Sequence, residues 1–348
     1  GLQRKLCERR LIRSIRHAYD HVPFYRQKYD AAGVDITSIR SADDIKRLPF
    51  VTKEEIRQNF PDGIVARGVN REACRYSATT GSTGRSLPFI FTQATYAFYV
   101  ALGVRMYTMI GYRPWHKMSY IKYTDLNYTR LGPFFRAVHI KSTIPVEEQI
   151  AQLRKAGADL IIGYASLVYE IARNATPDDL KDIRPKFIGI NSELSTEAQR
   201  TFISETFGCP VYDEYSTEET WMIASQCRCN NYHIFTDNVW VEFIDAKGQE
   251  VAPGDMGEIV LTTTRSPAMP FIRYRIGDMG RFSTAECPCG MGFPLLQSFE
   301  GRADDCFILP SGKFVSSLKL LNTFTMYIKK YLHLLEEFKV TQVHSDLI

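Results

Sequence analysis

The sequence predicts an α/β protein whose large N-terminal domain contains mainly parallel sheets flanked by helices, together with a β subdomain. From Lys117 onward, short apolar runs rich in β-forming residues alternate with segments of helical periodicity. This alternation is typical of a mainly parallel sheet covered by helices. After Cys229 the sequence changes to the two-residue alternation of antiparallel strands, with a turn at residues 246–249. These two patterns together predict the fold class.

Composition limits the classes of function. The 348 residues are enough for one large domain or two ordinary ones, and a hydrophobic share of 45% is typical of a globular protein. The net charge of +4 is too small to indicate nucleic acid as a main partner. No apolar run approaches the roughly 18 residues that span a bilayer, and the N-terminus lacks the apolar core of a signal peptide. We therefore expect a cytoplasmic protein without a membrane span.

The opening third of the chain is predicted to be helical, with no evident chemistry. Residues 2–31 carry apolar positions at helical spacing, and Pro23 interrupts this segment. Ser41 and Thr52 each precede an acidic residue three positions later, which is the pattern of a capped helix start. These segments lead to a loop with a very different composition.

Residues 76–87 form a stretch of hydroxyls and glycines between two short segments that we expect to be strands. Gly81 and Gly84 can adopt backbone angles closed to other residues, so successive N–H groups can turn inward and form a concave anion site. Arg85 adds a cation suited to phosphate. The alternative is a polar surface loop, and the spacing matches neither a Walker A motif nor G-x-G-x-x-G. The hydroxyl donors of the loop are Thr79, Thr80, Ser82 and Thr83.

The predicted parallel sheet places several polar segments at one edge. Ligands of such sheets bind at the carboxyl ends of the strands, so residues that follow the apolar runs are candidates for a site. They are residues 163–166, 191–193 and 216–219. The expected strands are 89–92, 118–123, 160–164, 187–190, 211–215 and 258–264, and the expected helices are 96–110, 147–156, 166–173 and 196–207.

Two short segments near the C-terminus pair arginine with acids. Residues 274–278 end in Asp278 on a predicted turn, where the carboxylate could accept both hydroxyls of a ribose. Residues 301–305 again place Arg302 beside acids. Each segment alone could be a surface salt bridge, and their joint presence downstream of the glycine-hydroxyl loop favours a nucleotide site.

The order of these motifs resembles that of the adenylate-forming superfamily of acyl-CoA synthetases and ligases. Within the superfamily the chain looks most like the phenylacetate–CoA ligase branch, which includes relatives in capsular-polysaccharide biosynthesis. The likeness covers nearly the whole chain. The four motifs are residues 80–86, 215–219, 274–278 and 301–305, and supporting segments are residues 21–26, 48–53, 257–263 and 269–275.

The resemblance implies a role for each matching position. Asp278 would bind the ribose hydroxyls of ATP and Arg302 would reach the same nucleotide. Glu219 would help to hold Mg²⁺, with Glu218 as the alternative ligand, and it would be catalytic together with Thr80 and Thr83 of the phosphate loop. The remaining residues that would bind the cofactor are Gly81, Ser82, Gly84, Ser192, Glu193, Tyr215 and Ser216.

The resemblance also implies a small α+β C-terminal domain that begins after Asp305. The family's adenylating lysine lies near the end of that domain in a Gly-Lys context, and this chain ends at Ile348 before any such motif. We therefore expect an N-terminal domain over residues 1–305 that binds ATP and the acyl substrate, and only the truncated start of the second domain over residues 306–348.

Two close pairs of cysteines form a separate candidate site. Cys227 with Cys229 and Cys287 with Cys289 offer four thiolates, which suit tetrahedral Zn²⁺, and His233 could replace Cys229. Relatives in the phenylacetate branch can carry a Cys/His cluster in the same two places. The alternative is free or packed thiols, and a zinc with four protein ligands would be structural.

The function that this resemblance implies is an ATP-dependent ligase that converts a carboxylic acid, expected to be aromatic, to its adenylate and passes the acyl group to CoA. One alternative acceptor is an amine, a hydroxyl or a carrier protein in polysaccharide or secondary-metabolite biosynthesis. A second alternative is a nucleotide-binding relative without catalysis. The sequence does not identify the acid. It also leaves the oligomeric state open, and a homodimer is one alternative. Candidate residues for shaping an acyl pocket are Tyr123, Tyr128, Phe134 and Phe135.

Overall fold

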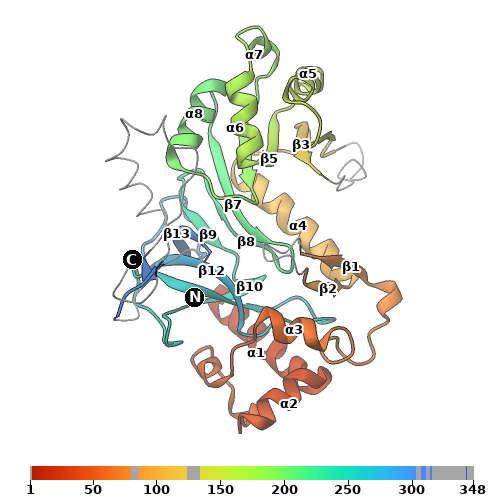
Figure 1. Ribbon diagram of the computed structural model, residues 1–348, viewed down its shortest axis with the longest axis vertical. Coiled ribbons are helices and arrows are strands. Elements are labelled where there is room, and N and C mark those ends of the chain that lie inside the picture. Colours follow the sequence, from red (N-terminus) through yellow and green to blue (C-terminus); the bar gives the residue numbers. More distant parts are fainter. Residues whose placement is uncertain are drawn as a thin grey trace.

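A computed structural model describes residues 2–79, 86–123, 134–302, 307–310, 314–315 and 342 (Figure 1). The predicted phosphate loop from Thr80 to Gly84 lies outside the described residues, as does Tyr128. The predicted domain boundary between residues 305 and 306 and most of the predicted C-terminal domain also lie outside them. The fold below is that of the described part of the chain.

The chain opens with helices, as predicted, and Pro23 separates the first two. Thr52 forms the predicted capping box, because its side chain accepts from the N–H of Glu55 while the Glu55 carboxylate accepts from the N–H of Thr52. The expected α-helix after Ser41 is instead a 3₁₀ helix. The elements of this region are α1 (Leu2–His21), α2 (Pro23–Ala31), α3 (Lys53–Asn59) and the 3₁₀ helices Ile36–Ser38, Asp43–Arg47 and Arg71–Ala73.

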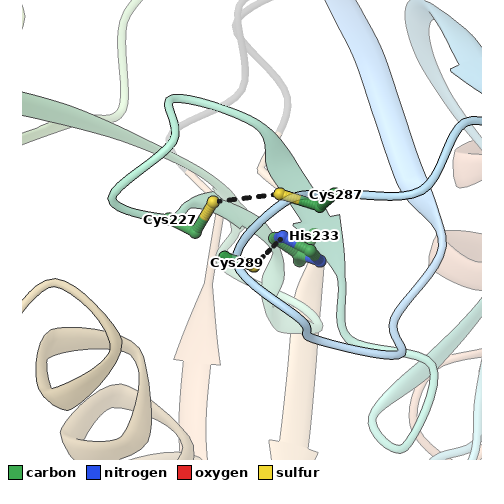
Figure 2. Close-up of side chains that lie close together, drawn as sticks. All are labelled: Cys227, His233, Cys287 and Cys289. Atoms are coloured by element: carbon green, nitrogen blue, oxygen red, sulfur yellow. Dashed lines mark hydrogen bonds between the residues drawn. The ribbon is translucent and has the colours of Figure 1, made fainter.

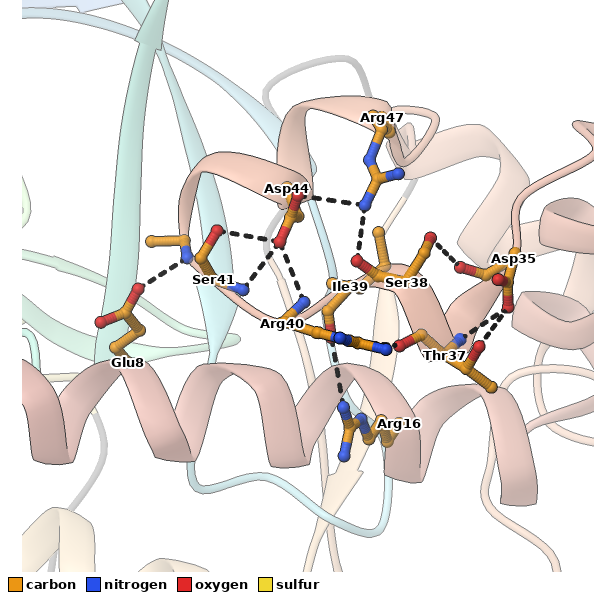
Figure 3. Close-up of polar contacts among 11 residues, drawn as sticks. Glu8, Arg16, Asp35, Thr37, Ser38, Ile39, Arg40, Ser41, Asp44 and Arg47 are labelled. Carbon is orange, nitrogen blue, oxygen red and sulfur yellow. Dashed lines mark hydrogen bonds and ion pairs between the residues drawn. The ribbon is translucent and has the colours of Figure 1, made fainter.

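Polar contacts hold the segment between α2 and α3 against α1 (Figure 3). A carboxylate oxygen of Glu8 in α1 accepts from the N–H of Ala42 at 2.9 Å, and Arg16 in the same helix donates to the carbonyl of Ile39 at 3.3 Å. The Asp44 carboxylate accepts from the N–H groups of Arg40 and Ser41, which explains the tight turn at this point. These contacts help to place the segment that leads into α3.

The central feature of the structure is a sheet of 11 strands in the order β10-β11-β12-β13-β9-β8-β7-β6-β5-β3-β4. The five strands from β4 to β7 are parallel, and all pairs from β7 to β10 are antiparallel. The predicted antiparallel region therefore continues the same sheet at β7. The strands are β3 (Met118–Lys122), β4 (Ala137–Lys141), β5 (Leu160–Tyr164), β6 (Phe187–Asn191), β7 (Val211–Thr217), β8 (Trp221–Gln226), β9 (Tyr232–Ile234), β10 (Val239–Ile244), β11 (Gly257–Thr263), β12 (Tyr274–Ser283) and β13 (Leu295–Arg302).

Helices cover both faces of the parallel strands, because alternate residues of each strand point to opposite faces. Ile161 of β5 packs in the cluster that contains α5, α6 and α8, whereas its neighbour Ile162 packs in the cluster that contains Leu102 of α4. Figure 1 shows α5, α6 and α8 near the upper strands and α4 running beside β8. The helices are α4 (Gln93–Met109), α5 (Val146–Ala156), α6 (Ala165–Asn174), α7 (Asp179–Asp182) and α8 (Glu197–Phe207).

Two further pairs of strands lie outside the central sheet. The hairpin of β1 (Arg75–Ala78) and β2 (Pro88–Phe91) is antiparallel and flanks the predicted phosphate loop. The second pair is β14 (Phe307–Ile308) and β15 (Phe314–Val315). Within the described residues, the structure has no helix that is both long enough and apolar enough to cross a lipid bilayer.

Candidate active site

Two cavities meet at the carboxyl ends of β5, β6 and β7. The first has a volume of about 430 Å³ and the second about 580 Å³. The structure places the polar segments after β6 and within β7 together at this edge of the sheet. The residues that line both cavities are Ser192, Glu193, Glu214, Ser216, Thr217 and Glu218.

Asp278 and Arg302 face each other in the first cavity as cross-strand neighbours of β12 and β13. Arg302 Nη1 donates to Asp278 Oδ1 at 3.0 Å, and the Tyr215 hydroxyl donates to Oδ2 at 2.8 Å. Burial raises the pKa of the Asp278 carboxyl, although the Arg302 charge and the Tyr215 hydrogen bond oppose that shift. Gly277 has φ +79°, and a Cβ there would lie 3.1 Å from the Arg302 guanidinium, so glycine gives Arg302 room.

Glu219 is another acidic residue that lines the first cavity. Its side chain is buried, and its Oε1 accepts from the Tyr274 hydroxyl at 3.0 Å, whereas the neighbouring Glu218 is exposed. Lys53, the first residue of α3, lines the same cavity. Burial lowers the pKa of the Lys53 ammonium, and the negative charge of Glu219 opposes this shift. The cavity thus has a buried carboxylate and a cation on facing elements.

The loop after β6 separates the two cavities. Ser192 adopts φ +66°, a left-handed conformation that is uncommon for residues other than glycine. The following Glu193 carboxylate accepts from the N–H of Ser166 at 2.8 Å, at the start of α6. This contact joins two of the segments that were predicted to line a site, residues 163–166 and 191–193.

The second cavity has aromatic side chains on part of its lining and a polar network on the rest. Glu214 Oε1 accepts from the side-chain Nδ2 of Asn191 at 2.5 Å, and Lys122 Nζ donates to the side-chain Oδ1 of Asn191. Burial raises the pKa of the Glu214 carboxyl to about 7, and it lowers that of the Lys122 ammonium. The apolar and aromatic lining residues are Tyr107, Tyr120, Tyr123, Ile162, Tyr164, Trp221 and Met222.

The four candidate aromatic residues of the acyl pocket have different positions. Tyr123 lines the second cavity. Phe135 lines a smaller cavity beside α4, and Phe134 is 59% exposed. Among the described members of this predicted set, only Tyr123 therefore contributes to the second cavity.

The structure brings three cysteines and one histidine together (Figure 2). The Sγ atoms of Cys227 and Cys287 are 3.6 Å apart, Cys289 Sγ lies 3.3 Å from His233 Nε2, and all four potential ligand atoms lie within 4.8 Å of one another. Two thiolates bound to one tetrahedral Zn²⁺ at about 2.3 Å are separated by roughly 3.8 Å. The cluster includes His233, whereas Cys229 is exposed and only its backbone N–H contacts Cys227 Sγ.

Several residues of the two cavities were not predicted as site residues. Lys53 belongs to a predicted helix start, and nothing in its local pattern indicates a ligand. Lys122 and Glu214 lie at or near the carboxyl ends of predicted strands, and this position is the one signal that could have identified them. Tyr274 lines neither cavity but contacts Glu219, and it lies in a motif that was recognised for Asp278 alone.

The comparisons with curated proteins show similarity along most of the chain, whereas no family model matches it. The chain is 28% identical over 322 residues to phenylacetate–coenzyme A ligase of Thermus thermophilus, covering 88% of this chain and 72% of that protein. The corresponding protein of Pseudomonas putida is 29% identical over 321 residues, covering 86% and 70%. Protein CapK of Staphylococcus aureus is 26% identical over 253 residues, covering 68% of this chain and 53% of CapK.

Solved structures share the fold. The open conformation of 2-hydroxyisobutyryl-CoA ligase in complex with 2-HIB-AMP and CoA has a TM-score of 0.81 at 22% identity, covering 93% of this chain and 74% of that one. Amide bond synthetase McbA of Marinactinospora thermotolerans has a TM-score of 0.53 at 16% identity, covering 76% and 56%. The predicted fold of an adenylate-forming ligase is therefore confirmed for the described part of the chain.

Proposed function

Because the chain is a relative of the phenylacetate–coenzyme A ligases and has the fold of acyl-CoA ligases, we propose that it converts a carboxylic acid and ATP to an acyl-adenylate and transfers the acyl group to CoA. The observation that carries this proposal is the meeting of two cavities at Ser192 and Ser216. One cavity holds Asp278 and Arg302, and the other combines Lys122 and Glu214 with the rings of Tyr120, Tyr164 and Trp221. Two substrates that lie in these cavities would meet at the shared wall.

The first cavity suits ATP. Asp278 would accept the ribose hydroxyls, since Tyr215 and Arg302 already hold its two oxygens in place. Lys53 would approach the phosphates, as would the loop of residues 80–84. Ser192, Glu193, Tyr215 and Ser216 would surround the rest of the nucleotide, and Tyr215 stacks on Phe299 with ring centroids 4.4 Å apart.

Glu219 is our first choice for a Mg²⁺ ligand, and Glu218 is the alternative. The buried Glu219 carboxylate faces the cavity, and carboxylate oxygens are the ligands that Mg²⁺ prefers. A bound Mg²⁺ would neutralise charge on the triphosphate. The protein's own contribution would be to hold the acid carboxylate and the α-phosphate at one place and to exclude water, because adenylation needs positioning more than a protein nucleophile.

Pyrophosphate exchange tests the adenylation step. The full-length protein, incubated with ATP, labelled pyrophosphate and one acid at a time, is expected to return label to ATP with at least one acid. Acids of aromatic, aliphatic and amino-acid type form the panel. A protein that binds ATP but exchanges with no acid would contradict the proposed ligase and favour the alternative of nucleotide binding without catalysis.

Acceptor dependence tests the second step. Formation of an acyl-CoA thioester when CoA is added would support the proposal. The alternative acceptors are an amine, a hydroxyl or a carrier-protein thiol, and a product that forms only with one of these would contradict CoA as acceptor. The division at residue 305, the cytoplasmic location and a homodimer stay predictions.

We further propose that Cys227, His233, Cys287 and Cys289 hold a structural Zn²⁺. The ligand types fit a closed tetrahedral site, and three of the four residues are buried. His233 Nδ1 lies 3.4 Å from the Phe293 carbonyl oxygen, a second contact that orients the imidazole. The metal would join the turn after β8 to the segment between β12 and β13, which leads to Arg302.

A further inference from the structure

Lys122 occupies an unusual position for a pocket that would take a flat apolar acid. It is the last residue of β3 and lines the second cavity, but not the first. Its Nζ lies 4.1 Å from the centroid of the Tyr164 ring. The second cavity therefore has a cation beside an aromatic ring.

The hydrogen bonds of Lys122 leave its third N–H donor without an oxygen acceptor among the described residues, beside the contact of the ammonium with the Tyr164 ring. Its Nζ donates to the side-chain oxygen of Asn191 and lies 3.2 Å from Ser192 Oγ. An ammonium group has three N–H donors, so these two contacts use two of them. No carboxylate of the described residues forms an ion pair with Lys122, although the negative charges of Glu214, Glu218 and Glu193 act on it from a greater distance.

The direction of the polar network favours a ligand that accepts a hydrogen bond. The Asn191 amide donates to Glu214 Oε1, so the Asn191 oxygen faces Lys122, and the Tyr107 hydroxyl lies 3.4 Å from Glu214 Oε2. Glu214 thus receives donors from Asn191 and Tyr107. Lys122 offers the spare donor of this network, and a desolvated donor without an acceptor is costly.

Resting on the proposed function, we infer that the second cavity selects an acid that carries a hydroxyl or carbonyl oxygen besides its carboxylate, and that Lys122 donates a hydrogen bond to that oxygen. The aromatic walls would hold the flat part of the acid. An acid without the second oxygen would leave the ammonium donor unpaired. Lys122 is therefore the specificity-determining residue of this cavity.

The ratio of kcat/KM for a hydroxyphenylacetate to kcat/KM for phenylacetate tests this inference. In pyrophosphate exchange, the wild-type protein is expected to use its best hydroxyphenylacetate, among the 2-, 3- and 4-isomers, with a kcat/KM about 10- to 100-fold above that for phenylacetate. The variant Lys122→Met replaces the unbranched part of the lysine side chain but has no donor, so its ratio should approach one. A ratio is independent of the fraction of folded enzyme, which separates selectivity from stability.

Lys141→Met is the matched control. Lys141 ends β4 and is the cross-strand partner of Lys122, but it is exposed and lines neither cavity. This variant should keep the wild-type ratio. Lys122→Gln retains a neutral donor, and an intermediate ratio would support the hydrogen bond.

Three results would overturn the inference. A wild-type protein that uses phenylacetate as well as every hydroxylated isomer would show that the cavity does not select for the second oxygen. A Lys122→Met variant that slows exchange equally for every acid would assign the ammonium to the reacting carboxylate. Absence of exchange with any acid, in a protein that binds ATP, would overturn the proposed function and this inference with it.

Discussion

The hydroxyl of Tyr215 donates a 2.8 Å hydrogen bond to Asp278, although their strands β7 and β12 are separated by β8, β9 and β13 in the order of the sheet. The twisted sheet therefore brings its parallel and antiparallel parts together at one carboxylate. Arg302 contacts the other oxygen of Asp278 from the neighbouring strand. A ribose acceptor at this position would be held from two sides before the nucleotide arrives.

The variant Asp278→Ala is expected to weaken ATP binding by roughly 1.5–3 kcal/mol, because charge-assisted hydrogen bonds to the ribose would be lost. Isothermal titration calorimetry with ATP measures the change. Asp178→Ala is the control, since that aspartate is exposed and pairs with Lys181. Equal ATP affinity in a folded Asp278→Ala protein would refute the role of Asp278.

The cysteine cluster predicts a metal-dependent stability. Cys287→Ser should release zinc and lower the melting temperature, since one of four ligands is lost. Cys229→Ser should retain the metal, because Cys229 is exposed outside the quartet. Elemental analysis and thermal unfolding of both variants provide the measurement. A wild-type protein without zinc, or loss of zinc from Cys229→Ser, would contradict the proposed ligand set.

Glu214 predicts a pH dependence of stability. Burial raises its pKa from 4.5 in the unfolded chain to about 7 in the folded protein, so its contribution to stability is present below pH 4.5 and is lost as the pH rises through 7. Glu214→Gln, which cannot ionise, should be similar to the wild type at pH 4.5 and more stable at pH 8, by roughly 2–3 kcal/mol.

Urea unfolding of this variant at several pH values, beside the exposed-site control Glu205→Gln, measures that difference. The control should follow the wild-type curve throughout. A Glu214→Gln protein whose advantage over the wild type does not grow between pH 4.5 and pH 8 would show that the folded-state pKa of Glu214 is not raised.

The buried ion pair of Arg273 and Glu242 predicts that the loss of Glu242 destabilises the fold much more than the loss of Glu250, whose ion pair is exposed. Arg273 donates to both carboxylate oxygens of Glu242 and to the Lys46 and Leu48 carbonyls, which attaches the segment before α3 to the sheet. Glu242→Ala should cost about 3–5 kcal/mol, because it leaves a buried guanidinium charge without its partner.

Glu250→Ala is the matched change, because that glutamate pairs with Lys46 but is 52% exposed. Exposed ion pairs contribute about 0–1 kcal/mol, so this variant should unfold at nearly the wild-type urea concentration. If denaturant unfolding shows the same loss of unfolding free energy for Glu242→Ala and Glu250→Ala, the ion pair of Arg273 does not stabilise the fold.

Elements whose formation depends on neighbouring residues could be predicted from the sequence. The apolar run at 160–164 became β5 over the same residues, and the acid three positions after Thr52 became a capping box. The glycine and hydroxyl pattern of residues 80–84 predicted a phosphate loop, which lies outside the described residues. Asp278 and Arg302 were both candidates before the structure showed their contact. β4 was not predicted, because its five residues follow a segment that reads as a loop.

Only the tertiary structure shows which residues far apart in the chain are in contact. It placed His233 with three cysteines, where the sequence favoured Cys229 and kept histidine as the alternative. It also joined Lys122, Asn191 and Glu214, which come from three different strands. Local periodicity reflects the geometry of one helix or strand, whereas such contacts depend on strand order and sheet twist, which side chains far apart in the chain establish together.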